Sequence, residues 1–312
     1  MTPHLGEILS LTVAMIWTCT AIFADEASHR IGSNTVNVIR LVLGTFFLGA
    51  ILWITIGVPW PLYADSRTWL WLALSALVGY VFGDYCLFNC YLYVGARFGQ
   101  LFMTIAPLMA AIAGWIMLGE AMSWKAWIAM AITLCGIAIS ILSRGEDHHL
   151  HTSLPLVGIL LGIGAGIGQG VGLVLSKIGM QYYAEAIPAA DATRVATMMP
   201  FASTMIRAIV GGAGFLLIMT LSRKLHMLRD AARNRKGLMF AILVTLTGPV
   251  LGVSLSLMAV RYANAGIAST LMALSPVFIL LPYSIIYKKK ISLRELLGVV
   301  VSVTGVAIFF LI

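Results

Sequence analysis

The chain has 312 residues, of which 60% are apolar and only 10% are charged, and its mean hydropathy is +0.97. A soluble domain carries about 25% charged residues, so this composition argues against a soluble enzyme, a secreted disulfide scaffold, a fibrous chain and a disordered protein. We assign the net charge of +8 to loops beside anionic lipid and not to nucleic-acid binding. The composition therefore predicts a protein embedded in a lipid bilayer.

Apolar runs long enough to cross a bilayer, which takes about 20 residues per helix, recur along the whole sequence. We expect an all-α polytopic membrane protein with ten transmembrane helices, at residues 5–24, 36–57, 68–93, 98–118, 124–142, 154–176, 200–222, 237–260, 265–287 and 294–312.

The two halves of the chain resemble each other. Residues 93–142 align without gaps on residues 262–311 at a constant offset of 169, which places Pro107 on Pro276. A proline that recurs at the same depth of two apolar runs indicates an internal duplication.

The duplication extends to an arginine, because Arg40 falls on Arg207 at an offset of 167. Five spans per half is an odd number, so the second half enters the membrane from the opposite side. We therefore expect two inverted five-helix repeats, at residues 1–143 and 154–312, joined by a polar linker at 144–153. Substrate sites of such proteins lie where the repeats meet.

Three of the ionisable side chains inside predicted spans are candidates for the cavity, because a charge in the bilayer costs at least ~2.5–3.5 kcal/mol and tends to face a cavity or a partner. Arg40 and Arg207 either face a central cavity and bind an anionic group, or extend to the headgroup region. Asp84 is a candidate site of proton coupling or substrate contact. Alternatively, it is a structural partner of Arg40, Arg97 or a helix end.

A glutamine, two prolines and four glycines inside the predicted spans are also candidates for residues that form a cavity. Gln169 offers a hydrogen bond either to substrate or to a neighbouring helix. Pro107 and Pro276 each remove a backbone hydrogen bond, which either frees carbonyls to line a cavity or only bends the helix. Four glycines of the sixth span recur at i,i+4 spacing, which predicts close helix packing and leaves room for a substrate path; they are Gly158, Gly162, Gly166 and Gly170.

No nucleotide, zinc-protease or nucleophile-elbow motif occurs in the sequence. His148, His149 and His151 are assigned to the solvated linker, and Cys86 and Cys90 to apolar packing. We expect no catalytic residues, no metal site and no cofactor.

The run Gly95–Glu120 (GARFGQLFMTIAPLMAAIAGWIMLGE) contains Pro107 and ends in Gly-Glu. Together with Arg40 it resembles the EamA-like branch of the drug/metabolite transporter superfamily, whose fourth helix is centred on a proline. The second half retains Arg207 and Pro276 but has two lysines at the Gly-Glu position. The resemblance implies ten helices in inverted repeats, in the cytoplasmic (inner) membrane.

The resemblance also implies transport of small metabolites or drugs, often as export. We expect a secondary exporter that works by alternating access, with a proton as candidate coupling ion. If Arg40 binds the substrate, anionic or amino-acid-like metabolites fit best. The alternative is a lipid flippase or another lipid-handling membrane protein.

Two arguments about the orientation of the chain in the membrane give opposite answers. Loop lysines and arginines place both termini outside by the positive-inside rule, whereas the family resemblance implies cytoplasmic termini, and we favour the latter. Neither argument fixes the substrate, the direction of transport or the oligomeric state.

Overall fold

We describe a computed structural model of the chain, which places residues 4–143, 155–278 and 292–311. The expected linker at 144–153 and residues 279–287 of the expected ninth span lie outside the described residues.

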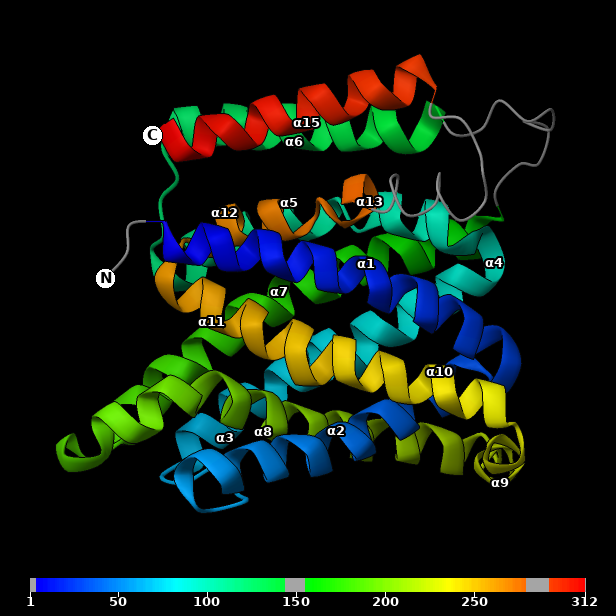
Figure 1. Cartoon of the computed structure of the whole chain (residues 1–312), viewed down its shortest axis with the longest axis vertical. Helices are drawn as coiled ribbons and strands as arrows, with labels where there is room; N and C mark the ends of the chain where they lie inside the picture. The colour runs from blue at the N-terminus through cyan, green and yellow to red at the C-terminus, as the bar shows by residue number, and fades with distance from the viewer. Residues whose placement is uncertain (1–3, 144–154, 279–291, 312) are drawn as a thin grey trace.

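The described elements are helices that lie side by side in a bundle (Figure 1). In chain order they are α1 (Leu5–Ile31), α2 (Ser33–Ile56), α3 (Ser66–Ala76), the π-helix η1 (Leu77–Asp84), α4 (Tyr85–Phe102), α5 (Ile105–Leu118), α6 (Trp124–Ser143), α7 (Leu156–Ala186), the 3₁₀-helix η2 (Ala189–Asp191), α8 (Ala192–Leu221), α9 (His226–Arg233), α10 (Arg235–Thr245), the π-helix η3 (Leu246–Val253), α11 (Ser254–Tyr262), α12 (Ala265–Met272), α13 (Ser275–Phe278) and α15 (Leu293–Leu311).

Eight helices in the described part of the chain are long and apolar enough to cross a membrane, as expected of a multi-pass membrane protein. Two of the ten expected spans are not among them. The span expected at 124–142 lies in α6 (Trp124–Ser143), which runs over its whole length. The span expected at 265–287 is interrupted after Met272, because the ring of Pro276 would clash with the Met272 carbonyl in a continuous α-helix.

Irregular segments recur at equivalent positions of the two halves. The π-helices η1 and η3 begin 169 residues apart, at Leu77 and Leu246. Pro107 and Pro276, also 169 apart, each lie in the first turn after a helix break, where the absent N–H of proline leaves no hydrogen bond unmade. The structural interruptions therefore follow the same offset as the sequence repeat.

Two N-cap residues, Asp65 and Asn234, are also 169 residues apart. Asp65 accepts a hydrogen bond from the Thr68 N–H at the start of α3, at 2.8 Å, and Asn234 accepts one from the Gly237 N–H at the start of α10, at 2.9 Å. Hydrogen bonds from Thr68 hold the pKa of the Asp65 carboxyl below its ordinary value. Each half thus begins its third long helix with an N-cap side chain.

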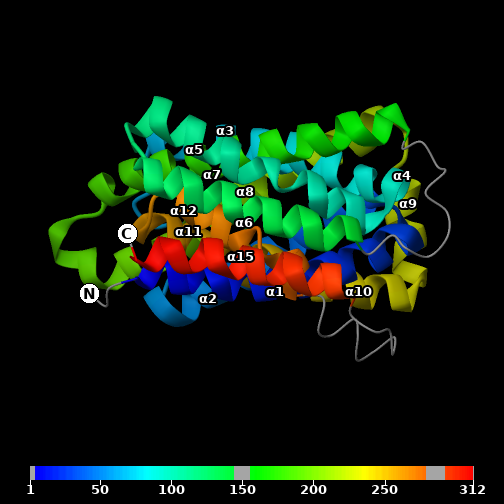
Figure 2. The ribbon, with the colours of Figure 1, turned by 90° about the horizontal axis from the view of Figure 1, so that it is seen from above.

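The helices α6 and α15 pack as an antiparallel pair at one edge of the molecule (Figures 1 and 2). Gly136 lies against Ser302, and Gly305 lies against Thr133. A Cβ atom on Gly305 would lie only 2.6 Å from the Thr133 nitrogen, so these glycines permit the close approach. Thr133 and Ser302 are equivalent residues of the repeat, and the Ser302 hydroxyl donates to the Thr133 carbonyl at 3.4 Å.

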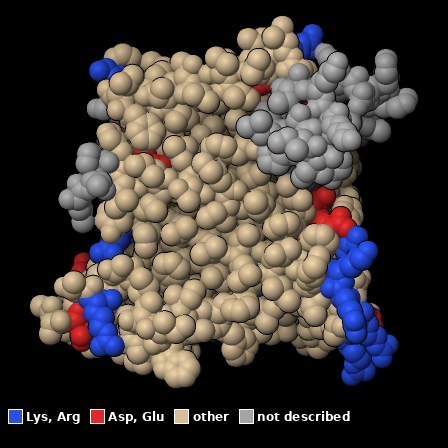
Figure 3. Space-filling model, in the orientation of Figure 1, with Lys and Arg blue, Asp and Glu red and all other residues tan. Residues whose placement is uncertain are grey.

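Charged side chains lie along two opposite edges of the molecule, with an uncharged band between them (Figure 3). The first residue of α1 and the last of α15 lie at one end of the helices, and α9 lies at the other (Figure 1). Six exposed basic residues occupy α9 and its flanks, namely Arg223, Lys224, Arg229, Arg233, Arg235 and Lys236. This distribution is that of a protein whose helices cross a bilayer.

Candidate substrate cavity

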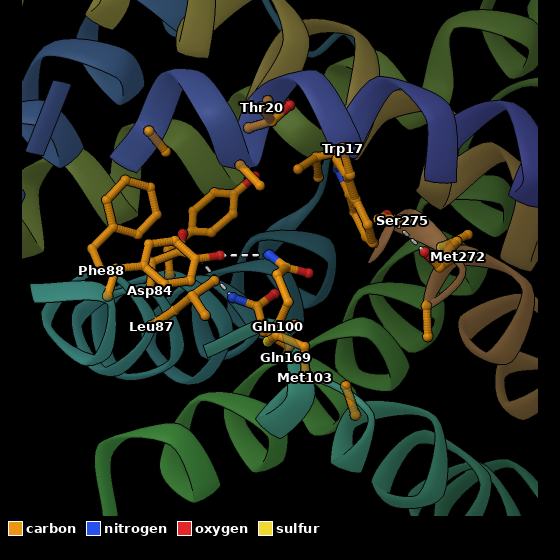
Figure 4. A pocket seen from close by; sticks show the side chains of 18 of the residues that line it. Trp17, Thr20, Asp84, Leu87, Phe88, Gln100, Met103, Gln169, Met272 and Ser275 are labelled. Carbon is orange, nitrogen blue, oxygen red and sulfur yellow. Dashed lines mark hydrogen bonds between the residues drawn. The ribbon is translucent and has the colours of Figure 1, made fainter. Parts of the chain in front are cut away.

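A cavity of about 120 Å³ lies in the interior, bounded by residues of both halves of the chain. Figure 4 shows Asp84 and Phe88 on one side of it, Met272 and Ser275 opposite, and Trp17 from α1 above. An apolar cavity of about 150 Å³ holds benzene, so a space of this size suits a small molecule. Most of its wall is aromatic or aliphatic.

Arg40 and Asp84 form a buried ion pair at this cavity. Nη2 of Arg40, on α2, donates to Oδ2 of Asp84 at the end of η1, and Nε of Arg40 donates to the Asn37 Oδ1 at 2.8 Å. The guanidinium also lies 5.0 Å from the centroid of the Phe88 ring. Arg40 is only 4% exposed, so its side chain lies in the interior and does not reach a headgroup region.

Gln169 connects α7 to this pair. Its Nε2 donates to Oδ1 of Asp84 at 2.6 Å and to the Gly79 carbonyl at 3.1 Å, and Gln169 also lines the cavity. Both carboxylate oxygens of Asp84 therefore have a partner. Glycine allows this contact, because a Cβ on Gly83 would lie 3.3 Å from the Gln169 backbone nitrogen.

Arg207 occupies a different position from Arg40. It is equally buried, at 4% exposure, but it is not among the residues that line the cavity. Its guanidinium lies 4.5 Å from the centroid of the Tyr80 ring, which Arg40 also approaches, at 5.5 Å. Tyr80 does line the cavity. One tyrosine ring thus contacts both arginines of the duplicated pair.

The four glycines at i,i+4 spacing on α7 lie against α4 and α5. Gly158 meets Val94, Gly162 meets Phe102 and Gly166 meets Ile105, while a Cβ on Gly170 would collide with the Ala106 carbonyl. Close packing of α7 is consistent with these contacts.

Both proline breaks adjoin the cavity. Pro107 lines it, and so do Met272, Ala273 and Ser275 beside the break that precedes Pro276. The Met272 carbonyl accepts a hydrogen bond from the Ser275 hydroxyl at 3.1 Å (Figure 4). Side-chain hydroxyls thus satisfy part of the backbone that the break frees.

Sequence reasoning did not put forward Tyr80, Phe88 or Gln100, which also line the cavity. The Gln100 Nε2 donates to the Tyr91 hydroxyl at 2.6 Å (Figure 4). Aromatic residues are common throughout an apolar chain, so their type alone gave no signal. The signal that could have identified Tyr80 as a cavity residue is its position, four residues before Asp84 and between Gly79 and Gly83.

An ion pair links the two halves at the end of the bundle where α1 begins. Lys177 on α7 pairs with the Glu120 carboxylate and donates to the Ala263 carbonyl at 2.7 Å, while Glu120 Oε2 accepts the Ala265 N–H at 2.9 Å. Lys177 is 12% exposed and Glu120 18%. Because Gly6 also packs against Ala263, α1, α5, α7 and α12 are joined at this end.

Comparison with known proteins identifies a family and a similar fold. A model of the EamA-like transporter family matches residues 4–142 and 156–311. A crystal structure described only as that of a protein has a TM-score of 0.71 at 14% sequence identity, and the match covers 99% of this chain and 98% of the other. At that identity the likeness concerns the fold alone. No curated protein matches the chain.

Proposed function

This chain belongs to the EamA-like transporter family, and we propose that it exports a small metabolite or drug by alternating access. Members of this family are membrane transporters and not enzymes. The observation that carries the finer proposal is the interior cavity, which residues of both halves line and which holds the Arg40–Asp84–Gln169 cluster.

The proposed architecture is ten transmembrane helices in two inverted repeats, at residues 1–143 and 154–312. The antiparallel contact of α6 with α15 supports the inversion, because Thr133 and Ser302 are equivalent residues that touch each other. A dyad through such a contact reverses the direction of every helix it relates. In this arrangement α12 and α13 belong to the ninth span.

The proposed binding residues are Arg40, Asp84 and Gln169, with the helix breaks at Pro107 and Pro276. A substrate with an anionic group matches the positive charge of the two arginines. Asp84 is the proposed site for a coupling proton, because it is the acidic side chain on the cavity wall. No observation on the described residues favours the lipid-handling alternative, so we do not propose it.

The test is the extracellular metabolite profile of cells that overproduce the protein in their cytoplasmic membrane. It is compared with cells carrying an empty vector, an Arg40→Ala variant, and an Arg223→Ala variant as the matched exposed control, all at equal membrane abundance. We expect one class of compounds to accumulate outside with the unmutated and Arg223→Ala chains only. Profiles identical to the empty vector for every variant would contradict export.

A further inference from the structure

The charges inside the protein do not balance. In the described part of the chain the buried charged residues are Arg40, Asp84, Arg207 and Glu295. Glu295 lies in the first turn of α15 and accepts a hydrogen bond from the Ser292 N–H at 2.7 Å, away from the cavity. Two arginines and one aspartate therefore remain around the cavity, and the cluster has a formal charge of +1.

Asp84 neutralises one arginine, and both of its carboxylate oxygens accept hydrogen bonds. One carboxylate oxygen binds Arg40, and the other accepts the Gln169 amide. The nearest further acid on α1 is Asp25, which faces His29 at 3.6 Å. The cavity wall thus offers no free carboxylate to a positively charged group of a substrate.

Arg207 carries the charge that is left over. It makes no ion pair or hydrogen bond with any described residue, and its Nε atom is buried without a partner. A buried unpaired charge is strongly destabilising, so a counter-charge at this place stabilises the protein. The ring of Tyr80, which the Arg207 guanidinium approaches, lines the cavity.

Tyr80 supplies a second unpaired group. Its side chain is 2% exposed, it lines the cavity, and its hydroxyl has no hydrogen-bond partner among the described residues. A buried hydroxyl without a partner costs free energy unless a ligand satisfies it. The remaining wall near it is apolar and includes Leu87, Phe88 and Met103.

We infer that the substrate is a small monoanion with an apolar body and no ammonium group, and that Tyr80 donates a hydrogen bond to its anionic group. Arg207, behind the Tyr80 ring, is a positioning residue that supplies the counter-charge, while Arg40 stays bound to Asp84. This inference rests on the proposed function, since it assigns the ligand of the same cavity.

The test measures binding to the purified full chain in lipid nanodiscs, with three probes that share a 3-methylbutyl chain and differ in the charged groups it carries. They are 4-methylpentanoate, a monoanion; leucine, a zwitterion; and 3-methylbutylamine, a cation. We expect the monoanion to bind at least tenfold more tightly than the other two. Equal or tighter binding of leucine or the amine, or no binding of the monoanion, would overturn the inference.

Four variants test the residues. Tyr80→Phe and Arg207→Gln should each weaken binding of 4-methylpentanoate at least tenfold, and Arg207→Lys should restore most of it because the charge is kept. Tyr183→Phe is the matched control, since its hydroxyl donates to the Leu62 carbonyl at 2.7 Å outside the cavity. Unchanged monoanion affinity in folded Tyr80→Phe and Arg207→Gln proteins would contradict the assignment.

The two proposals fail in different ways. Export of a zwitterion or a cation in the metabolite profile leaves the proposed function intact and overturns the monoanion inference. Selective binding of the monoanion without export of any compound supports the monoanion inference and contradicts the proposed export.

Discussion

The Arg40–Asp84 pair joins α2 to η1 in an interior where water does not compete for either charge. Both side chains are less than 10% exposed. Replacing a buried pair by neutral groups is often tolerated, whereas removing one partner leaves an uncompensated charge and costs about 3–5 kcal/mol. Here Arg207 adds a second positive charge close to Tyr80, so loss of Asp84 leaves the three-residue cluster with a charge of +2, whereas loss of Arg40 leaves Arg207 and Asp84, whose charges cancel.

We therefore expect Asp84→Asn to destabilise the protein more than Arg40→Gln does. The double variant Arg40→Gln/Asp84→Asn should recover part of the loss seen for Asp84→Asn, because the charge of the cluster falls from +2 to +1, its value in the unmutated protein. The measurement is the thermal unfolding midpoint of each purified variant in the same detergent. Additive losses in the double variant, or a milder loss for Asp84→Asn than for Arg40→Gln, would contradict this charge balance.

At the scale of elements, the polar link at the start of α12 joins the two halves of the chain. Lys177 comes from α7, Glu120 follows the end of α5, and Glu120 also caps the first N–H of α12. The α12 helix runs from this link to Met272 at the cavity. In alternating access this link holds one end of the cavity closed, so its loss favours opening there.

We expect Glu120→Gln and Lys177→Met to raise the reactivity of a Ser269→Cys side chain on the cavity wall. A partly buried pair worth about 1 kcal/mol changes an opening equilibrium about fivefold. The measurement is the rate of modification by a membrane-impermeant maleimide in a background without Cys19, Cys86, Cys90 and Cys135. Glu185→Gln, an exposed glutamate at the same end, is the control. Wild-type rates in both variants would show that the link does not restrain opening.

Hydropathy predicted the all-α membrane class, and the order of a few motifs across the two halves predicted the family. The sequence also predicted a repeat at an offset of 169, which the spacing of η1 and η3 follows. Arg40 was one of several expected partners of Asp84, and the structure forms that pair, but hydropathy could not choose among the alternatives and gave no indication that Gln169 would join them. Arg40 and Gln169 are 44 and 85 positions from Asp84, and hydropathy says nothing about which faces of distant helices meet.

The structure also differs from the sequence-based expectation in the continuity of the ninth span. The run 265–287 is apolar throughout, and hydropathy counts it as one span. In the structure the helix ends at Met272. A proline at position 276 is incompatible with a helical carbonyl four residues earlier, and a hydropathy profile does not register this effect. Pro276 and its equivalent Pro107 were noted as kink sites, but whether a proline bends or interrupts a helix depends on the neighbours that satisfy the freed carbonyl.

At the scale of the whole molecule, the arrangement of the ends constrains how the chain crosses the bilayer. The start of α1 and the end of α15 lie at one end of the helices, and the basic residues of α9 lie at the other (Figure 1). Basic loops are retained in the cytoplasm, which favours an α9 face on that side. The family resemblance favours the opposite orientation, so a labelling experiment on intact cells decides between them.

We expect His4→Cys and Glu185→Cys to be labelled from the same side of the membrane and Arg229→Cys from the other, because His4 and Glu185 lie at the end of the helices opposite α9. All three positions are exposed. Each variant is made in the background without native cysteines and treated with an impermeant maleimide, on intact cells and on permeabilised cells. Labelling of Arg229→Cys and His4→Cys from the same side would contradict the described arrangement. Protection of Arg229→Cys in intact cells would place the basic α9 face in the cytoplasm and the termini outside; protection of the other two would place the termini inside.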